Sequence, residues 1–144
     1  MDQRAIPFLF MRGGTSRGPY LLKHDLPGNR DQLSEVLIAI VGSGHSFNID
    51  GIGGGTAVTT KVAILSLSED SWADIDYFFA QVSVESRQVD YKPTCGNIMS
   101  GVGPAALELG LVPISYDVTD VRIRAVNTGA KVIARVQTVS YTHL

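Results

Sequence analysis

Clusters of glycine constrain this chain more than any other feature of its sequence. There are 15 glycines, and most of them fall into three short runs, which are Gly13–Gly18, Gly51–Gly55 and Gly96–Gly103. Glycine has no Cβ, so such runs predict tight turns and places where the backbone comes close to another group. Each run also stands beside a polar or reactive residue. The pattern therefore favours one composite binding site over three unrelated turns in a strand-rich fold.

Composition excludes several classes of protein. The 144 residues suit one domain, and 44% of them are hydrophobic, as in globular proteins. The 14 acidic and 12 basic residues give a net charge of −2 without a long run of one sign, which argues against a nucleic-acid partner. A single cysteine excludes an internal disulfide. The apolar run Ile6–Met11 is too short for a signal or membrane segment, so we expect a cytoplasmic protein with no membrane partner.

The order of apolar and polar residues predicts an α+β domain. A helix is expected over residues 31–41, with apolar side chains at helical spacing on one face (Leu33, Val36, Leu37 and Ile40). A second helix is expected over residues 98–109, and its small residues suit a helix enclosed closely by a barrel-like sheet. A long glycine-rich loop follows the first helix. Strands are expected at residues 5–11, 19–23, 61–67 and 76–84, and a hairpin at 121–126 and 131–136.

Cys95 is the first candidate for chemistry. It stands just before the second predicted helix, where free backbone N–H groups favour a thiolate. The alternative is a small buried hydrophobic residue, which is common for a free cysteine. Gly96 and Asn97 favour the reactive interpretation, because glycine admits a ligand and the Asn97 side chain can cap the helix or bind an oxygen.

Lys61 is the second candidate, at the start of an apolar strand that follows the glycine-rich loop. A partly desolvated lysine at a pocket can transfer protons near neutral pH or hold a carboxylate as a fixed charge. The alternative is a solvated lysine at the end of a strand.

The segment Arg12–Gly18 combines two arginines, two hydroxyls and bare backbone amides, which predicts an anion cradle. It lacks the spacing of a P-loop, and Gly51–Gly55 leads into a strand and not into the helix of a dinucleotide site. His24, His45 and His143 lie far apart, so the sequence predicts no zinc site.

Four sequence blocks together resemble the PrpF family, which holds 2-methylaconitate cis-trans isomerases and 4-oxalomesaconate tautomerases. The blocks are Met11–Gly18, Asp50–Gly54, Thr60–Ile64, and Cys95–Asn97 followed by Gly101–Pro104. The resemblance implies a diaminopimelate-epimerase-like fold, in which two similar domains each wrap a barrel-like sheet around a central helix. It also implies that residues 1–138 form the N-terminal domain of a two-domain protein. Residues 139–144 do not resemble a family continuation, and we expect a truncated or non-native tail.

The same resemblance implies roles for single residues. Lys61 and Cys95 fall where the family has its candidate acid and base, with no metal, nicotinamide or pyridoxal cofactor. Residues in the surrounding loops are expected to hold the carboxylates of a small unsaturated substrate. These residues are Arg12, Gly13, Gly14, Thr15, Ser16, Gly53, Gly54, Gly96 and Asn97.

The substrate and the activity of this chain stay open between three hypotheses. Residues Asp76–Gln81 and Val89–Tyr91, before Cys95, resemble the 4-oxalomesaconate tautomerases of the family, and 2-methylaconitate isomerisation is the alternative. Ile98 interrupts the Cys-Gly-Asn-Gly pattern of the amino-acid epimerases, which argues against racemase activity. From another class comes a half-domain that binds small anions without catalysis. A homo-oligomer is possible in each case.

Overall fold

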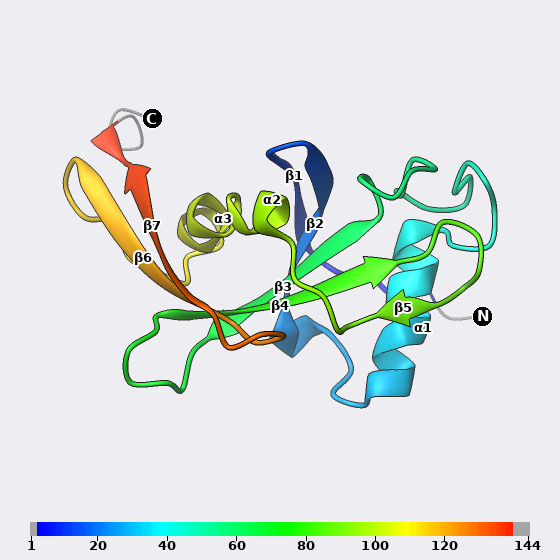
Figure 1. The fold of residues 1–144 in the computed structure, drawn as a ribbon, viewed down its shortest axis with the longest axis horizontal. Helices are drawn as coiled ribbons and strands as arrows, with labels where there is room; N and C mark the ends of the chain where they lie inside the picture. The colour runs from blue at the N-terminus through cyan, green and yellow to red at the C-terminus, as the bar shows by residue number, and fades with distance from the viewer. Residues whose placement is uncertain (1–2, 140–144) are drawn as a thin grey trace.

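The structure is a computed structural model that describes residues 3–139. One seven-stranded mixed sheet, curled into a half-barrel, organises this part of the chain (Figure 1). The strands pair in the order β1-β2-β3-β4-β6-β7, and β5 pairs with β4. The strands are β1 (Phe8–Gly13), β2 (Ser16–Leu22), β3 (Lys61–Leu67), β4 (Ile75–Val82), β5 (Val89–Asp90), β6 (Val118–Ala125) and β7 (Lys131–Gln137), and the helices are η1 (Lys23–Asp25), α1 (Arg30–Val41), α2 (Gly96–Met99) and α3 (Val102–Glu108).

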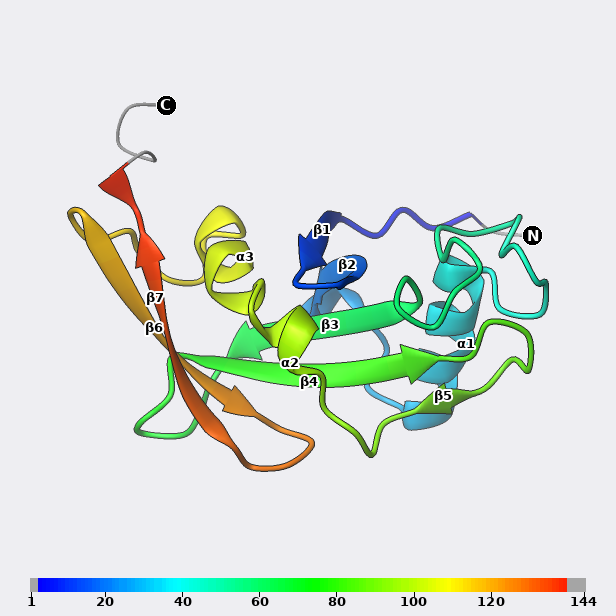
Figure 2. The same cartoon turned by 45° about the horizontal axis from the view of Figure 1, so that its top comes forward.

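Helix α1 covers one face of the sheet, and α2 and α3 cover the other. Each face is reached through a crossover connection between two parallel strands. The chain passes through α1 between the parallel strands β2 and β3, and through α2 and α3 between the parallel strands β4 and β6. Figure 2 shows α2 and α3 in the trough between the β1–β2 and β6–β7 hairpins. Each face has its own apolar cluster, one under α1 and one under α2 and α3. The predicted α+β domain, with a sheet wrapped around a helical segment, is confirmed.

The first predicted helix is confirmed as α1. Asn29 caps it, since its side-chain oxygen accepts from the backbone N–H groups of Asp31 and Gln32. Gly42 ends it with a φ of 82°, a backbone conformation that glycine adopts without strain. The buried face is rotated slightly from the predicted one: Ile38 and Val41 are buried with Leu33 and Leu37, whereas Val36 and Ile40 are half-buried.

The second predicted helix, over residues 98–109, is wrong as one continuous element. It consists of α2 and α3, separated at Ser100 and Gly101. Pro104 has no N–H to donate to the carbonyl group of Ser100, and its ring crowds that carbonyl, so the hydrogen-bond ladder is interrupted here. The predicted end at residue 109 is close to the observed one, since α3 ends at Glu108 with Leu109 as its C-cap, and Gly110 follows with a φ of 72°.

The small residues of this helical pair allow close approach of the sheet. A Cβ on Gly101 would collide with the hydroxyl of Tyr20, and a Cβ on Gly103 would press on Ala134 and Val136. The predicted enclosure of small residues by the sheet is therefore confirmed at both glycines.

Other boundaries differ by a few residues from those predicted. The first strand begins at Phe8, after Pro7, and β4 ends at Val82, while the short β5 has no counterpart among the predicted strands. The hairpin of β6 and β7 is confirmed. Of the predicted tail, residues 140–144 lie outside the described residues. None of the helices between residues 3 and 139 has the length and apolar character needed to cross a bilayer.

Gly18 provides a test of how closely β2 and β3 pack. A Cβ added here would collide with the backbone carbonyl of Lys61, whereas a Cβ on Gly28 would meet open space. We expect Gly18→Ala to lower the free energy of unfolding by about 1–3 kcal/mol or more, because backbone cannot move aside as a side chain can. The matched control Gly28→Ala should change it by less than about 0.5 kcal/mol. Urea unfolding measures both, and equal midpoints for the two variants would contradict the close packing.

Candidate functional site

The candidate site is built around the first turn of α2. Cys95 is half-buried and caps this turn, where its Sγ accepts from the backbone N–H of Ile98 at 3.5 Å. Of the two roles predicted for Asn97, capping belongs to Cys95, whereas Asn97 lies inside α2 and its side chain bonds to an oxygen of the neighbouring strand hairpin. Because α2 has four residues, nearby N–H groups contribute more at the thiol than a long helix dipole does.

The tip of the β1–β2 hairpin packs against this turn and brings hydroxyl groups to it. Asn97 Nδ2 donates to Thr15 Oγ1 at 3.0 Å, and the buried Ser16 Oγ lies 4.0 Å from Cys95 Sγ. A Cβ on Gly13 or Gly14 would collide with Asn97. Two glycine runs predicted as parts of one site thus meet directly, and their lack of side chains is what allows the contact.

Two tyrosines support the turn from below. Tyr20 Oη donates to the carbonyl of Ile98 at 2.6 Å, and Tyr77 Oη donates to the carbonyl of Cys95 at 3.2 Å. Burial raises the pKa of both phenols far above the ordinary value, and negative charge at Cys95 raises it further. Both side chains therefore stay neutral and hold the backbone carbonyls of Cys95 and Ile98.

Lys61 is the first residue of β3 and lies on the same sheet face as Cys95. Its strand neighbours Ala63 and Leu65 alternate onto the apolar cluster under α2, so Lys61 shares that face. The helix α2 packs against β1, β2 and β3. Lys61 Nζ lies 5.4 Å from the centre of the Phe79 ring, and Cys95 packs against the cluster that contains Phe79.

Of the remaining predicted residues, Gly96 lies beside Cys95, whereas Arg12, Gly53 and Gly54 lie away from this turn. Arg12 is the register partner of Arg17, next to the pair of Gly13 and Ser16, so strand alternation places Arg12 on the opposite face of the hairpin from Ser16. Gly53 packs against Val41 and Asn48, and Gly54 packs against the guanidinium of Arg17. Gly96 is exposed beside Cys95, with open space where a Cβ would be.

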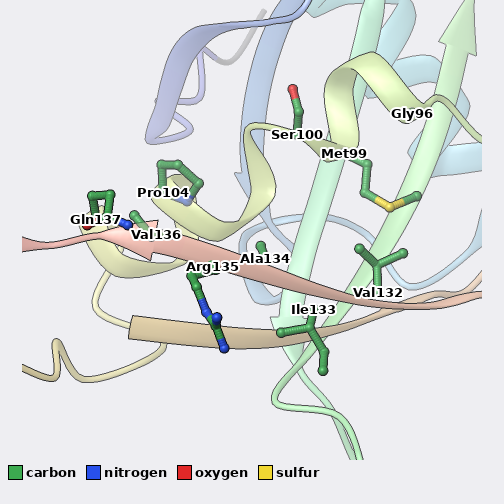
Figure 3. A pocket seen from close by; sticks show the side chains of 10 residues that line it. All are labelled: Gly96, Met99, Ser100, Pro104, Val132, Ile133, Ala134, Arg135, Val136 and Gln137. Carbon is green, nitrogen blue, oxygen red and sulfur yellow. The ribbon is translucent and has the colours of Figure 1, made fainter. Parts of the chain in front are cut away.

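A hollow of about 530 Å³ lies on the other side of α2, between α2, α3 and β7 (Figure 3). Among the predicted site residues, only Gly96 lines it. Much of its wall is aliphatic, with Met99, Pro104 and Val132 prominent, and its arginine, Arg135, is paired with Asp120. A wall of this kind gives a carboxylate little to bind, so the hairpin side of α2 is the better candidate site.

Sequence reasoning missed three residues that shape this site: Tyr20, Tyr77 and Gln81. Tyr20 and Tyr77 lie in strands where an apolar pattern suggests ordinary core packing, and nothing local shows which carbonyls their hydroxyls reach. Gln81 faces Lys61 across β3 and β4, a pairing that depends on the strand register. Among the described residues, no three His, Cys, Asp or Glu side chains form a group that could hold a metal ion.

The raised phenol pKa values predict a loss of stability in alkali. An unfolded tyrosine ionises near pH 10, so deprotonation then favours the unfolded chain. The contribution of Tyr77 to the free energy of unfolding should be complete below about pH 10 and lost as pH rises above it. We expect Tyr77→Phe to show a shallower loss of stability than the wild type between about pH 9.5 and 11 in urea unfolding. The exposed control Tyr116→Phe should follow the wild-type slope, and identical slopes for all three proteins would contradict the burial argument.

Comparison with known proteins places the chain in a family. The sequence model of the PrpF protein family matches residues 3–142. The putative isomerase YbhH of Escherichia coli strain K12 is 54% identical over 135 residues, which are 94% of this chain and 39% of that protein. The 4-oxalomesaconate tautomerase of Pseudomonas putida is 51% identical over 138 residues, 96% of this chain and 38% of that protein.

A solved structure agrees with these relatives. The crystal structure of a methylitaconate-delta-isomerase superposes with a TM-score of 0.89 at 42% identity, and the match covers 92% of this chain and 34% of that one. The chain thus spans about two-fifths of the length of the curated relatives that it matches. On the family match and these identities, the chain belongs to the PrpF family.

Proposed function

We propose that the protein containing this chain is a cofactor-independent isomerase that shifts a double bond by proton transfer in a small unsaturated di- or tricarboxylic acid. One observation carries the proposal. The half-buried thiol of Cys95 lies beside Ser16 at the hairpin tip, on the sheet face that also bears Lys61. This arrangement offers two groups able to exchange protons and several hydrogen-bond donors around them.

The reaction explains why such groups are useful together. Moving the double bond requires removal of a proton from an allylic carbon and addition of a proton at another carbon. The intermediate is a delocalised dienolate, which donors facing the developing charge stabilise. Cys95 and Lys61 supply the acid and base. The net charge of −2 gives no general attraction for an anion, so local groups have to bind the substrate.

The hairpin and the start of α2 supply candidate substrate contacts. Thr15 and Asn97 are exposed and already bonded to each other, Ser16 lies next to the thiol, and Gly96 leaves open space beside it. Gly13 and Gly14 serve the site by letting the hairpin approach α2. Arg12, Gly53 and Gly54 stay predictions, since they lie away from the turn that carries Cys95.

The favoured substrate is 4-oxalomesaconate, and 2-methylaconitate is the alternative within the same chemistry. Support for the first comes from the high identity to the relative named 4-oxalomesaconate tautomerase. An ultraviolet assay of double-bond migration with both acids, on a protein of the relatives' length that includes this chain, decides between them. Absence of turnover with either acid would overturn both assignments.

An anion-binding domain without catalysis is the candidate of another class. It is supported by the exposed donors at the hairpin tip. Isothermal titration of the 144-residue chain with trans-aconitate or citrate tests it. Binding together with absent turnover in the longer protein favours this candidate, whereas absent binding removes it.

We expect Lys61→Ala to reduce turnover more than Cys95→Ala. Lys61→Ala removes both a proton carrier and the positive charge that would bind a carboxylate. Cys95→Ala leaves the N–H groups of α2 and the Asn97 side chain in place, and should lower kcat by about 10²-fold. Steady-state kinetics on the longer protein measures both, with Lys131→Ala, whose ammonium lies by Asp70 and Trp72, as a control. Wild-type activity in Lys61→Ala would contradict the proposed role of the lysine.

A further inference from the structure

The ammonium group of Lys61 is held by a neutral side chain whose own orientation is fixed. We propose that Gln81 is a positioning residue, which aims Lys61 over the face that bears Cys95 and leaves its positive charge available to an anionic substrate. This inference rests on the proposed function, because it assigns Lys61 the task of meeting a carboxylate or dienolate.

The strand register brings the two side chains together. Lys61 and Gln81 are directly paired residues of the antiparallel strands β3 and β4, so both point to the same face of the sheet. Lys61 Nζ donates to Gln81 Oε1 at 2.6 Å, a short bond of the kind that charged donors form. The lysine side chain is long and flexible, so this contact selects one of its many conformations.

The carboxamide of Gln81 is anchored in one orientation. Its Nε2 donates to Thr60 Oγ1 at 3.1 Å and to the backbone carbonyl of Ala57 at 3.2 Å. A carboxamide turned by 180° would place its oxygen against the Ala57 carbonyl and its N–H groups against the Lys61 ammonium. Both contacts would be repulsive, so Oε1 has to face Lys61.

The surroundings of Lys61 leave its charge uncompensated. Its ammonium lies over the face of the Phe79 ring, a contact that favours a cation. Within residues 3–139, no carboxylate lies within ion-pair distance of Lys61. An ammonium has three N–H donors, and Gln81 accepts one of them. The other two donors and the full charge remain available to an anion. In Gln81→Glu the new carboxylate would compensate this charge.

A labelling experiment on the 144-residue chain tests the positioning without any activity. Acetic anhydride is reacted in pulses, and mass spectrometry gives the rate at Lys61 relative to Lys23, Lys92 and Lys131. In Gln81→Leu, which removes the acceptor, we expect Lys61 to react about fivefold faster than in the wild type, as loss of one hydrogen bond implies. Gln81→Glu retains an acceptor, so Lys61 should stay protected. The exposed Lys23, Lys92 and Lys131 normalise the reagent dose, and a cooperative urea-unfolding transition in each variant shows that it is folded.

The same variants separate positioning from a structural role when activity is measured. In the longer protein, Gln81→Leu should lower kcat about tenfold with little change in KM, because Lys61 then samples many conformations. Gln81→Glu should raise KM, because its carboxylate pairs with Lys61 and repels the substrate. If Gln81 had only a structural role, both variants would contain less active protein. KM would then not rise in Gln81→Glu alone.

The outcomes distinguish this inference from the proposed function. Equal Lys61 labelling in the wild type and Gln81→Leu would overturn the positioning role, whatever the activity. A wild-type protein inactive on both acids would overturn the proposed function, while the labelling rates still decide whether Gln81 holds Lys61. Protected Lys61 together with an unchanged KM in Gln81→Glu would show that Lys61 does not meet the substrate, and would overturn the second part of the proposal.

Discussion

The contact between the β1–β2 hairpin and the first turn of α2 is the interaction on which the site depends. Tyr20 donates a buried hydrogen bond to the carbonyl of Ile98, and Gly13, Gly14 and Gly101 remove the side chains that would hold the two segments apart. A buried carbonyl left without a partner is costly, so this bond also fixes the height of α2 above the sheet. Cys95 and Ser16 face each other because these two segments are in backbone contact.

The two faces of the sheet divide stability from chemistry. On one face α1 covers an aliphatic cluster, with caps at both helix ends, and the proposed reaction needs nothing from it. On the other face, α2 and α3 cover an apolar cluster that includes Tyr20, Tyr77 and Phe79, and the polar groups of the candidate site lie along its border. The helical segment on this second face is interrupted before Pro104. Because α2 is short and separate from α3, its first turn packs against the hairpin and need not lie along the axis of α3.

Much of this arrangement could be predicted from the sequence, and the rest fails for identifiable reasons. Apolar periodicity located α1 and the β6–β7 hairpin, and the glycine runs indicated close backbone approach, which the contact of Gly14 with Asn97 bears out. Local patterns do not show which segment a glycine approaches. The run at Gly53 and Gly54 packs on Val41 of α1 and on Arg17, and its part in substrate binding stays a prediction. Likewise, the capping residue of α2 depends on the turn geometry, and in this geometry Cys95, not Asn97, is the N-cap.

Not every titratable group near α2 can transfer a proton. The hydroxyls of Tyr20 and Tyr77 are close to the thiol, but both hydrogens are already donated to backbone carbonyls. Burial raises the pKa of both phenols above their ordinary value, which already lies well above neutral pH, so neither becomes a phenolate that accepts a proton there. Negative charge at Cys95 also raises the pKa of both phenols and so favours their neutral form. In the proposed reaction, Cys95 and Lys61 are therefore the proton carriers on this face, and the tyrosines keep the turn that carries Cys95 in place.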